Sequence, residues 1–150
     1  NNKFNITIVV VTHQMEVVKE ICNKFILLEG GKIKSHGFTD ELFIKPTKEM
    51  KILIGEEELL PITGYNIKIF FTKEITQSCL ITSLARQLDI DFSIVWGRLE
   101  KFRDSVMGSL IINTNEENKI KILKYLDERS IEWEIDSDLI QIENQNEDSK

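Results

Sequence analysis

The residue best placed for chemistry in the first half of the chain is His13, which follows the apolar run 6–11. A histidine at the carboxyl end of a buried parallel strand lies where α/β sheets bind ligands, and it can donate or accept a hydrogen bond near neutral pH. A turn histidine that bonds only to local backbone is the alternative. The other histidine, His36, stands in a Ser-His-Gly turn with no nucleophile motif around it, so little in the sequence favours a free-standing enzyme.

In the second half, two glycines interrupt strand-like runs and mark candidate binding positions. A glycine inside a strand indicates a bulge or a close approach of backbone or ligand, and both explanations stay open for Gly97 and Gly108. Trp96 fits a core or dimer-interface position as well as a ligand site. The apolar side chains expected to line a slot there are Ile94, Trp96, Leu110 and Ile112.

Composition excludes several classes of protein. The formal net charge is −6 and the pI is about 5.0, which argues against a nucleic-acid partner. No apolar run reaches the roughly 18 residues of a membrane span. Cys22 and Cys79 lie far apart, as expected in a reducing compartment. Asp89 and Asp91 flank the start of a strand and are expected to bound it, so we predict no metal site.

The elements that would position His13 follow from the apolar pattern. The β-branched run 6–11 predicts a strand buried on both faces, and apolar positions from Met15 to Cys22 recur at helical spacing. Glycines 30 and 31 predict a hairpin turn between strands 25–28 and 32–35. Short helices are expected after Thr39, ending before Pro46, and after Thr47.

From residue 65 the pattern predicts a second unit of order βαββαβ. The expected strands are 66–72, 92–102, 106–114 and 131–135, with helices capped by Thr76 or Ser78 and by Asn115. This is the ferredoxin-like motif, an α+β fold in which both helices cover one face of a four-stranded sheet. We expect a second copy of the chain to cover the other face, giving a homodimer.

A change in amino-acid composition sets the predicted domain boundaries. Three consecutive acids, then Pro61 and Gly64, indicate a linker over 55–63. The predicted domains are therefore 1–54 and 64–137, followed by a polar, disordered tail at 138–150. Because the chain starts with Asn1 and enters a buried-looking strand at once, we expect a fragment of a longer protein.

The stretch 8–37 resembles the end of an ABC transporter nucleotide-binding domain. The resemblance is carried by 9–15, Val-Val-Val-Thr-His-Gln-Met, and by 25–33, Phe-Ile-Leu-Leu-Glu-Gly-Gly-Lys-Ile. It implies that residues 1–54 are the C-terminal remnant of an α/β domain, with His13 as the catalytic switch histidine near the γ-phosphate. The intact parent would use ATP with Mg. This sequence has no Gly-rich P-loop, signature motif or acidic Walker B strand end, so we expect no ATP binding, cofactor or activity from this chain alone.

Residues 64–136 resemble the NIL domain that methionine-import ABC ATPases carry after the nucleotide-binding domain. The βαββαβ order matches, as do Leu84-Ala85-Arg86 and Gly108-Ser109-Leu110. In that family two NIL domains pair, bind methionine near the interface and inhibit transport when methionine is plentiful. The Asn-Ile-Leu that names the family appears here as Ser93-Ile94-Val95, and Ser93 lacks the amide. The ligand-binding residues that the resemblance and the strand pattern predict are Ser93, Ile94, Val95, Trp96, Gly108, Ser109 and Leu110.

The resemblance also implies partners and a location. We expect a second copy of the subunit, an integral membrane permease, and methionine as regulatory ligand, at the cytoplasmic face of the plasma (inner) membrane. The alternative is a dimerisation module of an ABC transporter ATPase for another substrate, which keeps the fold but has lost its ligand. Ser93 is the main argument for that alternative.

Overall fold

The computed structural model describes residues 6–55, 59–76, 78–103 and 105–135. The expected tail at 138–150 lies outside these residues. Among the helices of the described part, none combines the length and the apolar character that crossing a membrane requires.

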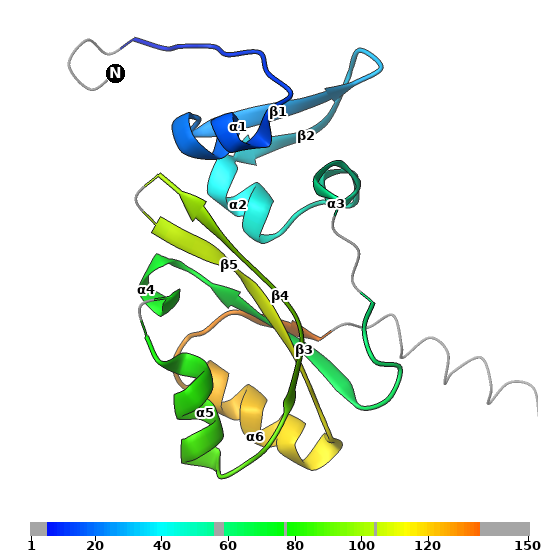
Figure 1. Ribbon diagram of the computed structural model, residues 1–150, viewed down its shortest axis with the longest axis vertical. Helices are drawn as coiled ribbons and strands as arrows, with labels where there is room; N and C mark the ends of the chain where they lie inside the picture. The colour runs from blue at the N-terminus through cyan, green and yellow to red at the C-terminus, as the bar shows by residue number, and fades with distance from the viewer. Residues whose placement is uncertain (1–5, 56–58, 77, 104, 136–150) are drawn as a thin grey trace, which may run out of the picture.

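The first half folds into a small unit of helices around a hairpin, here called the N-terminal unit, residues 15–54 (Figure 1). The expected hairpin is confirmed, and its turn residues Gly30 and Gly31 have φ of 55° and 73°, in the left-handed region that glycine tolerates. The hydroxyl of Thr47 accepts a hydrogen bond from Met50 N at the start of α3, as predicted. The elements are α1 (Met15–Ile21), β1 (Lys24–Glu29), β2 (Lys32–Phe38), α2 (Thr39–Ile44) and α3 (Lys48–Ile54).

The predicted strand at 6–11 is wrong: these residues have no regular secondary structure. Val9 is 84% exposed and Val11 is 96% exposed. An apolar run becomes a buried strand only where neighbouring strands satisfy its backbone and other layers cover both faces. In the described part of the chain no strand lies beside residues 6–11, so the run stays irregular.

The second half forms the predicted ferredoxin-like unit. Its sheet has the strand order β4-β5-β3-β6, and every neighbouring pair is antiparallel. The cap predicted at Thr76 or Ser78 is wrong, because a separate short helix α4 precedes α5 and the N-cap of α5 is Cys79. The elements are β3 (Tyr65–Phe71), α4 (Lys73–Thr76), α5 (Leu80–Leu88), β4 (Ser93–Phe102), β5 (Ser105–Thr114), α6 (Glu116–Asp127) and β6 (Trp133–Ile135).

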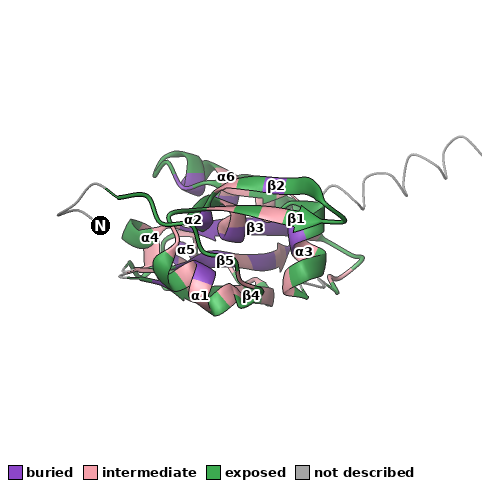
Figure 2. Cartoon of the chain, turned by 90° about the horizontal axis from the view of Figure 1, so that it is seen from above, coloured by how far each residue is buried: buried purple, intermediate pink, exposed green. Residues whose placement is uncertain are grey.

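Helices α5 and α6 cover one face of the sheet, here called the helix face, as predicted (Figure 1). Residues on alternate positions of the central strands, such as Ile67 and Ile112, point to this face and are fully buried. They pack against Leu84 of α5 and Leu126 of α6, also fully buried. Strands β3 and β5 are largely buried while the β1–β2 hairpin is mostly exposed (Figure 2). This core holds the ferredoxin-like unit together.

The other face, here called the opposite face, is not bare as the sequence suggested. Near the end of the β4–β5 hairpin, Phe102 and Met107 pack with Val18 of α1 and Phe43 of α2. The Lys45 ammonium, just after α2, lies 4.5 Å from the centroid of the Phe70 ring on β3. The N-terminal unit of the same chain therefore covers part of the face that we expected a second copy to cover.

Candidate functional site

The predicted ligand residues fall on two neighbouring strands. Ser93 to Trp96 begin β4, which lies at one edge of the sheet, and Gly108 to Leu110 lie in the adjacent β5. An outer strand leaves one row of backbone N–H and C=O groups without a partner strand. Ser93 and Ile94 are exposed, and Ile94 shows 59% of its surface. Backbone groups for binding an amino acid are thus available along β4.

The sheet divides these residues between its two faces. Trp96 pairs with Ile111, and Arg98 with Ser109, on the opposite face. Leu110 and Ile112 belong to the helix-face core, so they do not share a slot with Trp96. The pairing register of β4 shifts between Ile94 and Trp96. As a result Ile94 pairs with Ile112 on the helix face, whereas Trp96 pairs with Ile111 on the opposite face. The single apolar slot expected from these side chains is therefore wrong.

Both strand glycines are explained by the packing of the hairpin. A Cβ on Gly108 would lie 1.9 Å from the backbone oxygen of Arg98, because the two strands approach closely there. A Cβ on Gly97 would lie 2.7 Å from Leu110 Cδ1, which fills the space beside it. Neither glycine needs a ligand to account for it.

Trp96, Gly108 and Ser109 do come together, in a small cavity on the opposite face. Phe43 of α2 lines the same cavity. Its volume is about 10 Å³, room for about one water molecule. As α2 is placed here, this cavity admits no amino acid.

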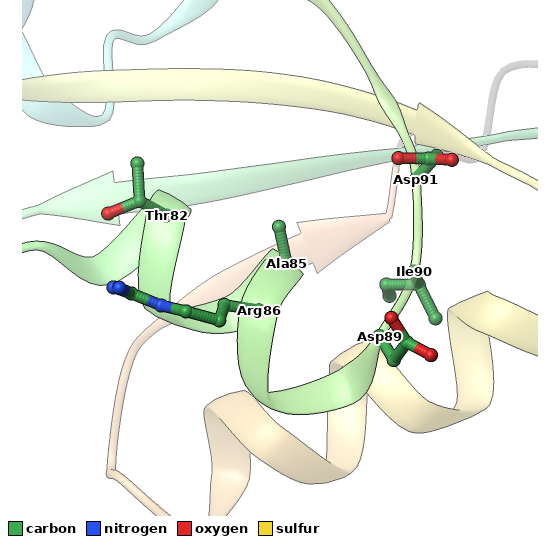
Figure 3. A pocket seen from close by; sticks show the side chains of 6 residues that line it. All are labelled: Thr82, Ala85, Arg86, Asp89, Ile90 and Asp91. Atoms are coloured by element: carbon green, nitrogen blue, oxygen red, sulfur yellow. The ribbon is translucent and has the colours of Figure 1, made fainter.

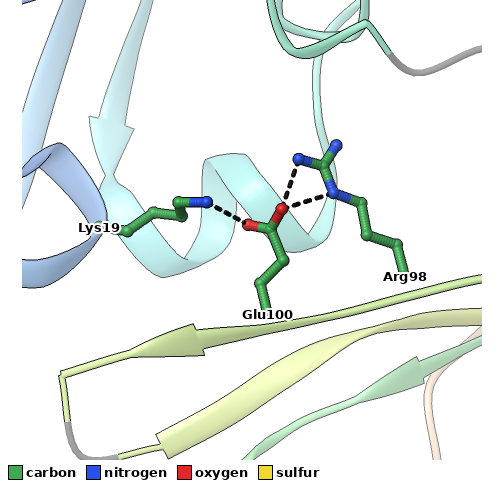
Figure 4. A network of polar contacts seen from close by, with 3 residues as sticks. All are labelled: Lys19, Arg98 and Glu100. Carbon is green, nitrogen blue, oxygen red and sulfur yellow. Dashed lines mark hydrogen bonds and ion pairs between the residues drawn. The ribbon is translucent and has the colours of Figure 1, made fainter. Parts of the chain in front are cut away.

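Two charged side chains of the outer strand line that cavity and tie it to α1. The Glu100 carboxylate accepts a hydrogen bond from Lys19 Nζ at 2.9 Å and one from Arg98 Nε at 2.6 Å (Figure 4). The side chains of Lys19 and Glu100 are only 13% and 18% exposed. Burial without a partner would penalise either charge, so the three groups stabilise one another.

This network was not predicted from the sequence, although the pattern contained a signal for it. Trp96, Arg98, Glu100 and Phe102 alternate along β4 and so share one face. Charged residues between aromatic ones on a single face indicate a surface that contacts another polar element rather than a plain core.

Two wider grooves lie near the start of β4. One has a volume of about 410 Å³ and is lined by the predicted residue Ser93, together with Asp91 and Asn113. Asn113 Nδ2 donates to Thr63 O at 2.9 Å and to Asn66 Oδ1 at 2.8 Å, which fixes its amide. Carboxylate, hydroxyl and amide groups of this kind suit the polar end of an amino acid.

The other groove, of about 590 Å³, shares Asp91 and runs along the end of α5 (Figure 3). Arg86 lies toward one end and Asp89 and Asp91 toward the other, with Ala85 between them. In the described part of the chain, no group of histidines, cysteines and carboxylates could hold a metal ion. Arg86 and the two aspartates give this groove charges of both signs.

Lys45 makes a second polar link between the N-terminal unit and the sheet. Its ammonium contacts the carboxylates of Glu132 and Glu134. Burial alone would lower the pKa of Lys45, but its hydrogen bonds and charge attraction to both glutamates outweigh burial and raise the pKa above its ordinary value of 10.5. The raised pKa keeps the Lys45 ammonium charged in this contact.

His13 is exposed and lies on the irregular segment before α1. The parallel sheet that would place it beside a phosphate is not formed by the described residues. Its catalytic role stays a prediction for an intact parent.

Comparison with known proteins shows what the chain is similar to. The NIL domain family matches residues 65–135. The methionine import ATP-binding protein MetN of Clostridium tetani is 53% identical over 90% of this chain and 42% of that protein. The protein of the same name from Clostridium acetobutylicum is also 53% identical, over 90% of this chain and 43% of that protein. The chain thus spans about two fifths of these relatives, and the matched region is their C-terminal part.

One solved structure, the C-terminal domain of an ABC transporter ATP-binding protein from Enterococcus faecalis, is similar at a lower level. It is 20% identical, with a TM-score of 0.43, over 51% of this chain and 87% of that one.

Proposed function

Residues 65–135 belong to the NIL domain family, and from that premise we propose that this unit is the amino-acid-sensing domain of the ATP-binding subunit of an ABC importer for methionine. Relatives that are 53% identical carry the name methionine import ATP-binding protein. The observation that carries the proposal is the outer strand β4, which presents Ser93-Ile94-Val95 beside a groove of suitable polar groups.

Methionine needs partners for two charges and an apolar surface for its thioether chain. The Asp91 carboxylate and the Ser93 hydroxyl line the groove, where an ammonium group can bind them. In the described part of the chain no strand pairs with the outer side of β4, and the backbone N–H groups at its start, around Ser93 and Ile94, suit the ligand carboxylate. Phe92, which lines the same groove, offers apolar surface there. Together these groups fit an amino acid better than a metal or a nucleotide.

Nucleotide chemistry does not fit the residues of this chain. Of the family's phosphate-contacting motifs, only His13 is present in the sequence, and it is exposed. A triphosphate needs a cradle of backbone N–H groups and a lysine, which the missing P-loop would supply. We therefore assign ATP and Mg to the intact subunit, which also binds the membrane permease at the cytoplasmic face of the membrane.

Regulation follows if methionine binds one arrangement of the transporter better than another. A coupling of about 1–3 kcal/mol between sites is typical of such control. Methionine added to the intact transporter is expected to lower its ATPase rate several-fold. An unchanged ATPase rate would show that feedback inhibition is wrong. It would not contradict the binding of methionine to this domain.

Calorimetry on the full chain tests the binding step. We expect heat from methionine and much less from glutamine, whose amide would leave polar groups unpaired on an apolar surface. Ser93→Asn restores the residue for which the family is named and is expected to bind at least as tightly. If no amino acid binds either protein, sensing by this domain is wrong.

The alternative function, a dimerisation module without ligand, is favoured by the apolar residues on the outer strand. Ile94 is 59% exposed and Leu99 53% exposed, and an outer strand is a natural surface for a second copy. Ile94→Lys should then lower the dimer fraction in sedimentation. Ile120→Lys on α6, at a position 64% exposed, is the matched control. A chain that dimerises through β4 but binds no amino acid would support this alternative.

A further inference from the structure

Arg86 has no part in the core or in the groove at Ser93. It follows Leu84 and Ala85 on α5, and Leu84 is fully buried on the helix face of the sheet. Arg86 is exposed and lines the groove of about 590 Å³ along the end of α5, here called the α5 groove (Figure 3). That volume lies within the range of about 300–1,000 Å³ for pockets that bind small molecules. What Arg86 can bind therefore follows from the groove that it lines.

The α5 groove has charges of opposite sign at its two ends. Figure 3 shows the Arg86 side chain extending toward Thr82, whereas Asp89 and Asp91 lie toward the other end. None of the three charged side chains makes a hydrogen bond or an ion pair with another residue of the described part of the chain. These charges are thus available to a ligand.

The turn after α5 fixes the acidic end of the groove. The backbone N–H groups of Asp89 and Ile90 both donate to Ala85 O, the second at 3.2 Å. Asp89 has a φ of 52°, in the left-handed region that aspartate tolerates better than most residues. A helical residue three positions after Arg86 would face it. The left-handed backbone turns Asp89 out of that row and keeps the two charges apart.

The separation of the charges sets the length of the ligand. Thr82 and Asp89 are seven positions apart, which corresponds to about 10 Å along a helix that rises about 1.5 Å per residue. An extended peptide advances about 3.3–3.6 Å per residue, so about three residues cover this distance. A free α-amino acid carries both charges on one carbon atom and cannot contact both ends. Ala85, between the charges, and Ile90 offer apolar surface to small side chains.

We infer that the α5 groove is a second binding site, whose ligand is an extended peptide of about three residues with both ends free. The peptide ammonium binds Asp89 and Asp91, and the peptide carboxylate binds the Arg86 guanidinium, which can donate two parallel hydrogen bonds to it. Arg86 is the donor at this end, because the Thr82 hydroxyl already donates to Cys79 O at 3.1 Å.

This site is independent of the proposed amino-acid site. Arg86 and Asp89 line the α5 groove and not the groove at Ser93, whereas Ser93 and Asn113 line only the latter of these two. The two grooves share Asp91, so that residue is left unchanged in the test. Variants at Arg86 and Asp89 therefore report on the peptide site alone.

Calorimetry on the full chain, with trialanine as the titrated probe, tests the site. Trialanine amide lacks the carboxylate and N-acetyl-trialanine lacks the ammonium, so each leaves one end of the groove without its partner. Because the charged groups of the groove are exposed, we expect each of these two probes to bind about three- to fivefold more weakly than trialanine.

Two variants identify which end of the peptide each side chain binds. Arg86→Gln should weaken trialanine binding by about three- to fivefold. It should leave trialanine amide unaffected, because that probe has no carboxylate. Asp89→Asn, which keeps a side chain that tolerates the left-handed backbone, should weaken trialanine and leave N-acetyl-trialanine unaffected. Lys124→Gln is the matched control: its side chain is 78% exposed on α6, and its loss should not change trialanine binding.

The outcomes separate this inference from the proposed function. Absence of trialanine binding to the native chain, or equal weakening of trialanine and its amide by Arg86→Gln, overturns the peptide site. Methionine binding should be the same in Arg86→Gln as in the native chain. Methionine binding without trialanine binding would overturn the peptide site alone. Trialanine binding without methionine binding would overturn the sensing function alone.

Discussion

The close approach of β4 and β5 at Gly108 yields a sharp prediction about stability. In Gly108→Ala the new Cβ would lie 1.9 Å from the Arg98 backbone oxygen, 2.9 Å from Arg98 C and 3.0 Å from Leu99 Cα. Real Cβ atoms are essentially never closer than 3.0 Å, so the strands must separate by 3.0 − 1.9, or about 1.1 Å. Because the obstacle is backbone, no side-chain rotation relieves it.

Separation by that distance stretches the neighbouring ladder hydrogen bonds beyond useful length. Losing two such bonds costs about 1–3 kcal/mol, and overpacking adds a further cost of about 1–3 kcal/mol. We therefore expect Gly108→Ala to lower the free energy of unfolding by about 2–6 kcal/mol, a large part of the roughly 5–15 kcal/mol typical of a folded domain. Urea unfolding followed by circular dichroism measures it, with an unchanged m-value as the check for two-state behaviour.

Gly97→Ala is the matched control on the neighbouring strand. Its Cβ meets only Leu110 Cδ1, at 2.7 Å, and the flexible end of a side chain can turn aside. We expect a loss of about 1 kcal/mol. If Gly108→Ala destabilises the protein no more than Gly97→Ala does, the close backbone approach does not explain the glycine at 108. Binding of a ligand there would then be the better explanation.

Three further predictions concern the helices. Asn115→Ala removes the side chain that accepts a hydrogen bond from Asn118 N at 2.8 Å at the start of α6. It should lower the free energy of unfolding, measured in urea, by about 1 kcal/mol. The hydrogen bond and the charge of Lys121 lower the pKa of Glu117. The stability that the ionised Glu117 contributes is therefore present above pH 4.5 and is lost as the pH falls through the lowered pKa. In Lys121→Ala an NMR titration should find the Glu117 pKa nearer 4.5, and no movement would contradict the pairing. Leu84→Ala leaves a cavity at a fully buried position and should lower the free energy of unfolding by about 2–5 kcal/mol in urea unfolding. A free energy of unfolding that hardly changes would contradict the packing of α5 on the sheet.

The local pattern is enough to predict the ferredoxin-like unit. Residues 106–114 were predicted as a strand and 116–126 have helical apolar spacing after a cap at Asn115, and the structure has β5 and α6 there. The strand-like run that contains Ser93-Ile94-Val95 likewise predicts a strand, and these residues begin β4. Local propensity, apolar spacing and caps all favour the same elements here, and such agreement makes a fold predictable.

Other features required contacts between distant parts of the chain. The run 6–11 has the composition of a buried strand, yet it stays irregular because strand formation depends on neighbours that a local pattern does not contain. The short helix α4 and the cap at Cys79 were not predicted either, because a single helical turn carries almost no periodic signal.

The sequence by itself determined the order of the elements, the family resemblance and the absence of phosphate-binding motifs. Only the tertiary structure decided which residues share a surface. It separated Leu110 from Trp96, because cross-strand pairing and the bulge at Val95 assign them to opposite faces of the sheet. It also brought Phe43 and Lys19 onto β4, since packing joins apolar and charged groups at sequence distances that no local period encodes.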